Sequence, residues 1–525
     1  MKGAPVLGLV FSNLFTTPAL PKRWRWTLLC LFALHAALGA ALGLSVDEAH
    51  YALYAARPAL SYFDHPPLVG WVQWPLVALQ APGALLRLIP GLLWLLTVLL
   101  VYRLAWRLSV LSGRQEAAGR AGAWALLVLL LAPLMHILGI GLLPDTLLML
   151  LSVALMLHTL HMMELPAAAL QRPAPWLLLG VLLGLAGLSK YTAIFSALAV
   201  AACLLHAHGV GLLRNIWLWL ACLLALLMIS PVLIWNAQHQ WISFVYQLRH
   251  GAGGGWRLLE VLRFLLVQLL AYGALLWYGL AGVPRVAPKL RSLAGLFAIT
   301  FAIFAFMAGG GSSLPHWTAP AWVALAPFAG LALAAKQKPG RVVAALAALQ
   351  LLFCLALPLA MLSAGMPWME GQVARPEATD PPNPLADLHG WDAAGARALE
   401  LARANGLDAV AVQNWTLASR IGWYARPLKV HVLEDRFYQF DLWDGKLPVG
   451  AAALLVDWSQ LPYVTPLGAH GFAGCRPLDR LEVRRFGYSV AHFDYYACSG
   501  WSGQPQPRIA PPSSSSDSSN AGKPA

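Results

Sequence analysis

Charged side chains are scarce in this chain. Only 11% of its 525 residues are Asp, Glu, Lys or Arg, whereas 59% are hydrophobic. A soluble globular protein has about 25% charged and about 45–50% apolar residues. This shortage of charge excludes an ordinary soluble protein and indicates a protein that crosses a membrane several times.

Three further absences narrow the possible functions. Four of the six cysteines lie in apolar runs, and the six form no metal-ligand spacing. The first apolar run is not followed by a small-residue cleavage site, so we expect a retained helix rather than a cleaved signal peptide. The glycine-rich run 251–255 has no strand before it and no Gly-Lys-Ser/Thr after it, which excludes a nucleotide-binding phosphate loop.

The formal net charge of +13 does not indicate nucleic-acid binding. Most Lys and Arg residues sit in short loops between apolar runs, where they orient helices in a membrane. Positive loops alternate with loops poor in Lys and Arg, which predicts a cytoplasmic N-terminus and a C-terminal region outside.

Apolar runs of about 20 residues, the length needed to cross a bilayer, recur through residues 1–365. We predict about eleven transmembrane helices in this region. They cover residues 26–44, 84–106, 121–139, 143–163, 175–189, 191–208, 215–235, 258–281, 292–309, 316–335 and 341–364.

After residue 365 the composition becomes that of a soluble domain. Residues 366–505 carry ordinary numbers of charges and turn residues. The short apolar runs 407–412 and 452–456 predict buried strands, and residues 393–404 predict an amphipathic helix. We therefore expect a small periplasmic α/β domain, followed by a disordered tail over residues 506–525.

Two cysteines, Cys475 and Cys498, lie in this outer domain. They flank two apparent strands, 481–486 and 489–493. A hairpin would bring its ends together, and disulfides persist outside the cytoplasm. We predict a Cys475–Cys498 disulfide; the alternative is two free thiols.

The loop between the first two spans concentrates ionisable and aromatic residues. Asp47 and Glu48 either orient an acceptor nucleophile or cap the following helix. Asp64 and His65 precede a Pro-Pro pair, and they either bind a metal or phosphate or complete a turn. The density of charge favours a functional site.

Further ionisable residues come from other loops predicted to face the same side. Asp145 begins a predicted helix, either as a cap or as a site residue. Lys190 interrupts an apolar stretch, where an ionisable group indicates function unless it snorkels to the interface. Arg249 and His250 lie in a glycine-rich loop, and His316 begins another span. Fixed cations and carboxylates on one side suit an anionic, lipid-linked sugar donor.

Six motifs in order support a family resemblance. They are DEAHY, YFDHPPL, LLPDTLL, GLSKYTA, PVLIWNAQHQWISFVYQLRHG and LPHWTAP. Over roughly residues 20–365 the chain resembles bacterial members of the protein O-mannosyltransferase and aminoarabinose (lipid A) transferase superfamily. These are GT-C glycosyltransferases that use polyprenyl-phosphate sugars, so the resemblance implies a GT-C fold.

The resemblance also implies roles for individual residues. Asp47 takes the position of the catalytic-loop aspartate, with Glu48 as its acidic neighbour. Asp64 stands where aminoarabinose transferases have a metal-contacting glutamate, and His65 stands where they have a lysine. Because of these two differences, the resemblance determines neither whether a metal is used nor which sugar is transferred.

We predict an inverting glycosyltransferase that moves a sugar from an undecaprenyl-phosphate donor to a lipid or glycan acceptor. It would act at the periplasmic face of the inner membrane, with a divalent metal as its one potential cofactor. The alternatives are a lipid-linked sugar flippase, for which no internal repeat is evident, and a protein O-glycosyltransferase. The expected site comprises Asp47 and Glu48 for catalysis, Lys190, Arg249, His250 and Asp145 for the donor phosphate, Tyr51, Tyr62, His65 and His316 for sugar or acceptor, and Asp64 for a metal.

Overall fold

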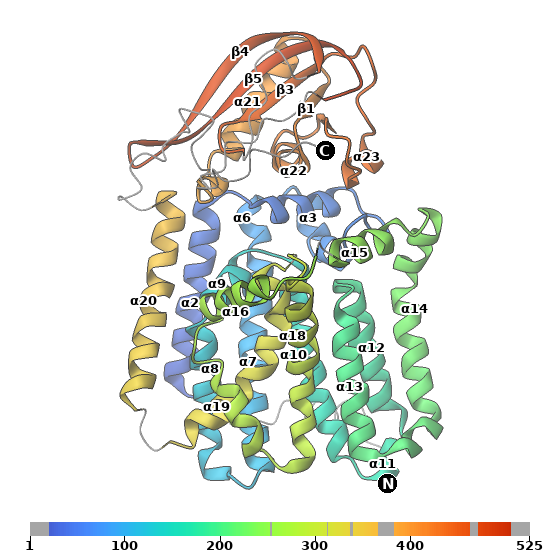
Figure 1. The fold of residues 1–525 in the computed structure, drawn as a ribbon, viewed down its shortest axis with the longest axis vertical. Helices are drawn as coiled ribbons and strands as arrows, with labels where there is room; N and C mark the ends of the chain where they lie inside the picture. The colour runs from blue at the N-terminus through green and yellow to red at the C-terminus, as the bar shows by residue number, and fades with distance from the viewer. Residues whose placement is uncertain are drawn as a thin grey trace, which may run out of the picture. The chain divides into compact units, whose positions relative to one another are not determined.

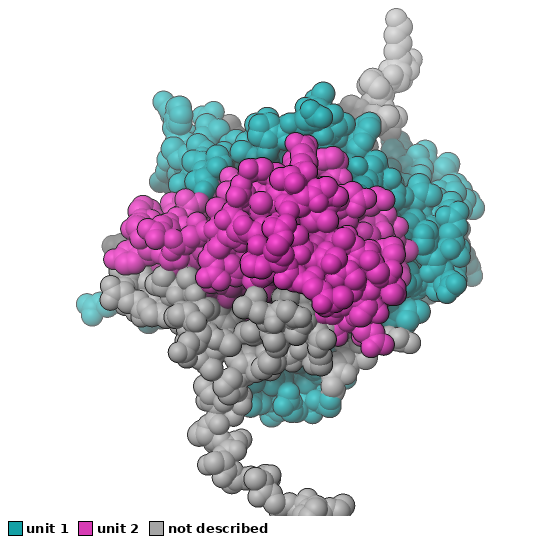
Figure 2. Space-filling model, turned by 90° about the horizontal axis from the view of Figure 1, so that it is seen from above, with its two compact units in different colours: residues 1–41, 51–358 teal, residues 42–50, 359–525 magenta. Residues whose placement is uncertain are grey.

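The computed structural model describes residues 20–252, 255–311, 313–336, 340–365, 383–461 and 471–505, and within 249–252 it describes only the backbone. The chain forms two compact units, coloured separately in Figure 2. Unit 1 comprises residues 1–41 and 51–358, and unit 2 comprises residues 42–50 and 359–525. The expected tail, 506–525, lies outside the described residues. The expected domain boundaries stay a prediction.

Unit 1 is a bundle of apolar helices (Figure 1). Within the described ranges, seven helical stretches are long and apolar enough to cross a membrane. Several begin with proline at the first turn, a position where its missing N–H leaves no hydrogen bond unmade. The seven stretches contain the helices α2 (Lys22–Ala41), α7 (Leu88–Leu111), α10 (Pro144–Glu164), α14 (Ile216–Gln238), α18 (Gly295–Ala308), α19 (Ala319–Ala334) and α20 (Arg341–Ser363).

The remaining expected spans are bent, shorter or broken. Range 121–139 is not one straight helix: α8 (Ala118–Leu130) and α9 (Pro133–Ile140) meet at 75°, where Pro133 cannot continue the hydrogen-bond ladder. α12 (Pro173–Ser189) and α13 (Ala193–His208) are shorter apolar helices. Range 258–281 is broken, because α16 (Leu258–Tyr272) ends at Gly273, whose φ of +79° suits glycine.

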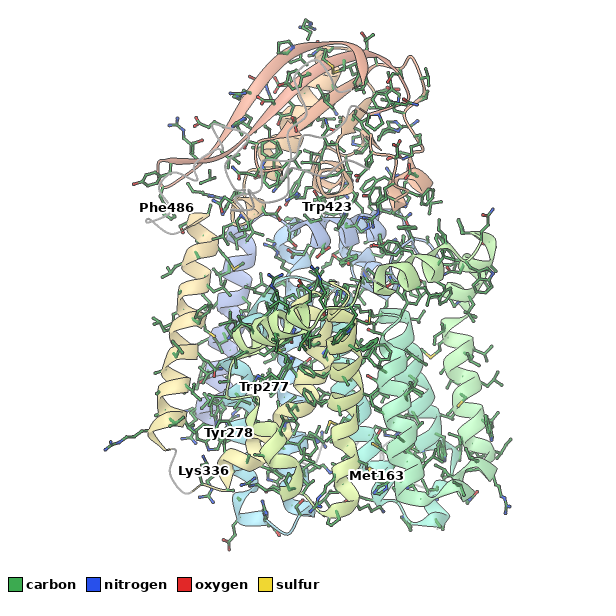
Figure 3. All side chains as sticks on the ribbon, viewed as in Figure 1. Met163, Trp277, Tyr278, Lys336, Trp423 and Phe486 are labelled. Atoms are coloured by element: carbon green, nitrogen blue, oxygen red, sulfur yellow. A yellow bond between two sulfur atoms is a disulfide. The ribbon has the colours of Figure 1, made fainter. Side chains whose placement is uncertain are left out.

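The centre of unit 1 is α19. All its residues are buried, and it packs against α7, α8, α10 and α17 (Tyr278–Gly282). Small residues permit the close approach, and a side chain at Gly330 would clash with the backbone of α8. Trp277 packs against Trp322 with 5.0 Å between ring centroids. Lys336 Nζ lies 5.1 Å from the ring centroid of Tyr278, and both residues are labelled in Figure 3. α14 and α20 are mostly exposed, as expected for helices that face lipid.

Shorter helices connect the bundle. α3 (Val46–Ala56) spans the boundary between the units, and the loop after it leads to α4 (Leu68–Trp71), α5 (Trp74–Ala78) and α6 (Gly83–Leu86). α15 (Ile242–Ala252) follows α14. The other short helices of unit 1 are η1 (Gln115–Ala117), α11 (Ala167–Leu170), η2 (Val210–Arg214), η3 (Val283–Arg285), η4 (Pro288–Ala294) and η5 (Pro315–Thr318).

Unit 2 is built on a five-stranded mixed sheet of order β2-β1-β3-β5-β4. Its first three strands are parallel, whereas β5 runs antiparallel to β3 and β4. The sheet and the helix expected at 393–404 are confirmed, and the hairpin strands are longer than expected. The strands are β1 (Ala409–Val412), β2 (Lys429–Val432), β3 (Ala453–Trp458), β4 (Phe472–Arg485) and β5 (Tyr488–Trp501).

Two helices cover one face of this sheet. α21 (Trp391–Ala404) contacts β1 and β3, and α22 (Trp415–Tyr424) contacts β1 and β2. Trp391 packs on Phe493 and Trp458 at 4.8 and 4.9 Å between ring centroids. Asn414 caps α22 by accepting a hydrogen bond from the Leu417 N–H at 3.0 Å. Two further short helices are η7 (Ala386–Leu388) and α23 (Gln439–Trp443).

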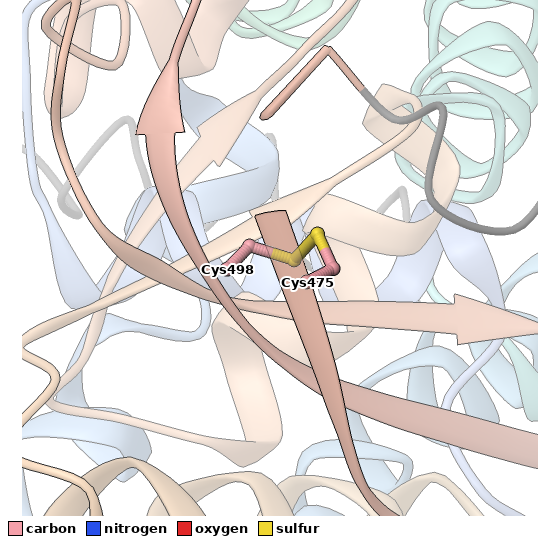
Figure 4. The surroundings of a disulfide bond; sticks show 2 residues. All are labelled: Cys475 and Cys498. Atoms are coloured by element: carbon pink, nitrogen blue, oxygen red, sulfur yellow. A yellow bond between two sulfur atoms is a disulfide. The ribbon is translucent and has the colours of Figure 1, made fainter. Parts of the chain in front are cut away.

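The predicted disulfide is confirmed. Cys475 of β4 and Cys498 of β5 face each other in the antiparallel ladder, with Cα atoms 4.1 Å apart, and their sulfur atoms are bonded (Figure 4). The hairpin thus places the two thiols opposite each other, which is why sequence spacing sufficed to identify them.

We expect the double substitution Cys475→Ala and Cys498→Ala to destabilise unit 2. The bond closes a separation of 23 residues, for which the chain-entropy model gives about 3 kcal/mol. Thermal unfolding of the purified full chain, with and without reductant, checks this. Wild type in reductant serves as the matched control and should approach the double variant; equal midpoints for all samples would contradict the expectation.

A second expectation concerns Asp457 on β3, which faces Asp494 on β5. Burial first, and the nearby Asp494 charge next, raise the pKa of Asp457 from 3.8 to about 6. The folded state therefore holds this proton more tightly than the unfolded state, so stability falls as pH rises from about 4 to about 6. Asp457→Asn should flatten this part of the curve of melting temperature against pH. If the slope between about pH 4 and pH 6 is unchanged, groups other than Asp457 cause the pH dependence of stability.

Candidate active site

A buried ion pair lies in the interior of unit 1. Lys190 Nζ is 2.7 Å from both carboxylate oxygens of Asp145. The two residues are only 5% and 1% exposed. Two charges removed from water in this way must compensate each other, because an unpaired buried charge is costly.

Local structure explains how these two residues meet. Asp145 lies in the first turn of α10, and Lys190 directly follows the last residue of α12. Each charge has the sign that its helix end favours, negative at the N-terminus and positive at the C-terminus. Ser189 donates a hydrogen bond to the Pro144 carbonyl at 2.8 Å, which joins the two helix ends. The alternative explanation, that Lys190 snorkels to the interface, is therefore not supported, since its ammonium group is buried.

Two residues from η5 complete this group. His316 Nε2 lies 3.9 Å from Asp145 Oδ2, and the Lys190 ammonium lies 5.6 Å from the centroid of the Trp317 ring. We call Asp145, Lys190, His316 and Trp317 the Lys190 cluster. An ammonium group has three N–H donors, and two of them are taken up by Asp145. Within the described part of the chain, one donor is therefore left for a ligand.

The next residue connects this cluster to two other motifs. The Tyr191 hydroxyl lies beside the side chains of Ser61, Ser243 and Asn236. Its ring packs against Phe244 at 5.3 Å. The GLSKYTA motif therefore contacts both the first loop and the segment where α14 leads into α15.

The first loop and α15 also contact each other directly. Ser243 donates to the Tyr62 carbonyl at 3.0 Å, and Gln247 donates to the Asp64 carbonyl at 2.6 Å. Phe63 packs on Tyr246 at 4.7 Å between centroids. These contacts fix the backbone of YFDHPPL. Five of the six motifs thus belong to one connected set of contacts in unit 1, and the last residue of the sixth, Tyr51 of DEAHY, joins it through His65.

Asp64 and Tyr62 are held tightly within the loop. Tyr54 donates a hydrogen bond to Asp64 Oδ1. Burial, and next the Asp64 charge, raise the pKa of Tyr54 well above its usual value, so its hydroxyl stays protonated and donates. Tyr62 is fully buried, stacks on Tyr54 at 3.5 Å, and donates to the Tyr54 carbonyl at 2.7 Å. These contacts give Tyr62 a structural role in the loop, and its expected contact with sugar stays a prediction.

The other expected binding residues are placed less fully. Tyr51 and His65 lie edge to face at 5.6 Å. Arg249 and His250 belong to α15, but their side chains lie outside the described residues. Their expected role at the donor phosphate stays a prediction.

The expected metal at Asp64 finds little support. Among the residues that the structure describes, no group of three or more His, Cys, Asp or Glu could hold a metal ion. The carboxylate of Asp64 accepts the Tyr54 hydrogen bond instead. We therefore derive no chemical step through a metal.

Asp47 and Glu48 both lie in the first turn of α3, within the part of the chain that belongs to unit 2. Glu48 accepts a hydrogen bond from the Ser45 N–H at 3.0 Å, and Ser45 Oγ accepts one from the Glu48 N–H at 3.4 Å. This reciprocal pair is a capping box. Glu48 therefore caps α3, the alternative considered for the acidic pair, whereas Asp47 remains the candidate catalytic carboxylate.

Sequence reasoning missed several residues around these groups. Trp317 and Tyr191 stand next to predicted residues within recognised motifs, so a closer reading of the same motifs would find them. Tyr54 carries no such signal, because its bond to Asp64 depends on the fold of the loop.

The chain is similar to known proteins in the sequence of one segment and in its fold. A family model described as dolichyl-phosphate-mannose-protein mannosyltransferase matches residues 64–235. The chain is 17% identical to ArnT from Cupriavidus metallidurans bound to undecaprenyl phosphate, with a TM-score of 0.59 over 90% of this chain and 98% of that chain. The apo state of ArnT matches with 16% identity, a TM-score of 0.59, and coverage of 90% and 97%.

A third solved structure is more distant. Archaeal oligosaccharyltransferase AglB from Archaeoglobus fulgidus, in complex with an inhibitory peptide and a dolichol-phosphate, has 13% identity and a TM-score of 0.39, covering 76% of this chain and 64% of that chain. No curated protein sequence matches the chain. The predicted resemblance and GT-C fold class are confirmed by the family model and by the ArnT fold.

Proposed function

We propose that this multi-pass membrane protein, which shares the fold of ArnT, is a glycosyltransferase that uses an undecaprenyl-phosphate-linked sugar. Its acceptor would be a lipid or glycan of the cell envelope. A relative of the same fold was solved with undecaprenyl phosphate bound, which supports a lipid-linked donor. The family model that matches residues 64–235 is likewise named for a polyprenyl-phosphate sugar donor.

The observation that carries the proposal is the Lys190 cluster. A leaving lipid phosphate needs a fixed cation, and Lys190 is fixed by Asp145 with one N–H donor remaining within the described part of the chain. His316 stands beside the same carboxylate, with its Nε2 atom 3.9 Å from Asp145 Oδ2. The buried, low-dielectric surroundings strengthen any interaction with a phosphate.

The proposed reaction is a single displacement with inversion. The acceptor oxygen forms a bond to the anomeric carbon, and the bond from that carbon to the phosphate oxygen breaks. The electron pair leaves with the lipid phosphate, whose charge Lys190 stabilises. Asp47 orients the acceptor and takes its proton where the attacking group is a hydroxyl.

The membrane orientation is proposed from loop charge. Arg103 and Arg107 lie in the C-terminal part of α7, Arg114 follows this helix, and further Lys and Arg residues occupy every second loop after it. By the positive-inside rule these loops face the cytoplasm. The N-terminus would then be cytoplasmic and the C-terminal domain periplasmic, in the bacterial inner membrane.

The deciding experiment is sugar transfer by the purified protein in detergent. Radiolabelled undecaprenyl-phosphate sugars would be incubated with envelope lipid and glycan fractions, and with peptide as a control acceptor. A detergent micelle does not separate two compartments, so a flippase would give no glycosylated acceptor, whereas a glycosyltransferase would. Product on peptide alone would indicate a protein O-glycosyltransferase. No transfer to any acceptor, together with movement of the donor across proteoliposome membranes, would refute the proposal.

A further inference from the structure

We propose that unit 2 holds the catalytic segment in place, and that Arg420 of α22 is the positioning residue for the Asp47 carboxylate. This inference rests on the proposed function, because it assumes that Asp47 acts in sugar transfer. The inference gives unit 2 a role in catalysis, although its sheet and the helices that cover it lie outside the six motifs.

The first support is that residues 42–50 are bound to the rest of unit 2 along their length. The Gly43 N–H donates to the Leu388 carbonyl at 2.9 Å, and the Leu44 N–H donates to the Tyr424 hydroxyl at 2.9 Å. A side chain at Gly43 would come within 3.1 Å of the Leu388 carbonyl oxygen. The backbone just before Asp47 is therefore fixed from two sides.

A third contact lies on α3 itself. His50 Nδ1 is 3.1 Å from Ser419 Oγ. The Ser419 hydroxyl donates its own hydrogen to the Trp415 carbonyl at 2.8 Å, so it accepts from His50. The His50 ring also lies among aromatic rings, with Trp415 at 5.6 Å and Phe440 at 5.9 Å between centroids.

These contacts place Asp47 within electrostatic range of Arg420. Asp47 and His50 are three residues apart on one helix, and residues at this spacing share a face. Their counterparts, Arg420 and Ser419, are neighbours on α22. The attraction of the Asp47 charge acts on the Arg420 guanidinium, in addition to the ion pair of Arg420 with Asp387.

Arg420 is built into the domain as a rigid cation. It is only 1% exposed, and its guanidinium lies 3.8 Å from the ring centroid of Trp391 and 5.0 Å from that of Trp458. Its Nε donates to the Thr416 carbonyl at 3.1 Å. Burial lowers the pKa of Arg420, while Asp387 and then Asp47 oppose that effect. A cation fixed in this way keeps a nearby carboxylate ionised and in one orientation.

The charged and titratable groups that face Arg420 come from several elements. Asp387 belongs to η7, Tyr424 belongs to α22, and Asp47 belongs to α3. On α3, Glu48 is engaged in the capping box and His50 is engaged by Ser419. Removal of the Arg420 charge should therefore act first on Asp387, its ion-pair partner, and next on Asp47, and of these two carboxylates only Asp47 is assigned to the reaction.

The test is the pH dependence of turnover in Arg420→Gln and Arg420→Lys, measured with the full-length protein in detergent. Without the cation, the acid limb of the kcat profile should move to higher pH by about one unit or more. At neutral pH kcat should fall about tenfold, with little change in KM for the lipid-linked donor. Arg420→Lys should restore much of the profile, because it keeps the charge.

Two further variants keep the test decisive. Arg397→Gln is the matched control. It removes the ion pairs of Arg397 with Asp479 and Glu400 in the same domain, and neither partner belongs to residues 42–50. It should have the wild-type profile. Tyr424→Phe removes only the hydroxyl that binds Leu44 and should lower kcat even if Arg420→Gln does not fold.

The outcomes separate this inference from the proposed function. Inactive Asp47→Asn combined with wild-type kcat and pH profile in Arg420→Gln and Tyr424→Phe would overturn the inference alone. An Asp47→Asn variant with full activity would instead refute the proposed role of Asp47. A parallel loss in Arg397→Gln would show that general loss of domain stability causes the effect, and this too would overturn the inference.

Discussion

Replacement of Asp47 by asparagine is expected to lower sugar transfer by about 10²–10⁴-fold, the usual effect of losing a general base or orienting acid. Asparagine has nearly the same size and can still accept a hydrogen bond, so α3 should stay folded. Binding of the lipid-linked donor should change little, because we assign the donor phosphate to Lys190. The measurement is turnover of purified protein under saturating donor.

The neighbouring acid provides a matched control. Glu48→Gln keeps the capping box, because the side-chain oxygen of glutamine can also accept the hydrogen bond from the Ser45 N–H. We therefore expect turnover near that of the wild type. If Glu48→Gln loses as much activity as Asp47→Asn, Glu48 has a chemical role in addition to its cap. If Asp47→Asn keeps more than about a third of wild-type turnover, Asp47 is not the base or the orienting acid.

Replacement of Lys190 by alanine is expected to have two effects, on stability and on donor binding. It leaves the Asp145 carboxylate buried and without its cation, and breaking a buried pair in this way costs about 3–5 kcal/mol. It also removes the cation that we assign to the lipid phosphate, so transfer should fall below detection. Unfolding temperature and binding of undecaprenyl phosphate would be measured separately on the same preparations.

A double substitution separates the two effects. Lys190→Met combined with Asp145→Leu replaces the pair by apolar side chains of similar volume, which is often neutral for stability. The double variant should regain the wild-type melting temperature but should not bind the donor. Lys190→Arg should restore binding only in part, since a planar guanidinium does not fit the site of an ammonium group. Full activity in the double variant would mean that the ion pair only joins α10 to α12.

The sequence alone was sufficient for features that depend on local pattern. The length of an apolar run decides whether a helix can cross a bilayer, so α2, α7, α10, α14 and α20 lie within or close to the expected ranges. Two apparent strands, 481–486 and 489–493, likewise predicted the hairpin, and the cysteines that flank them predicted its disulfide. The bend before Pro133 and the end of α16 at Gly273 were less well predicted, because the apolar composition continues through both breaks.

The tertiary structure decided which charged residues act together. Asp145 and Lys190 are 45 positions apart, and Tyr62 and Ser243 are 181 positions apart, so their contacts leave no periodic trace in the sequence. Glu48 and Asp47 look alike in a list of acidic residues, yet one binds its own helix end and the other experiences the charge of Arg420. The physical reason is that the role of a charge depends on its partners and its access to water. Both are set by packing between distant segments, whereas the position of a membrane span is set by the residues within it.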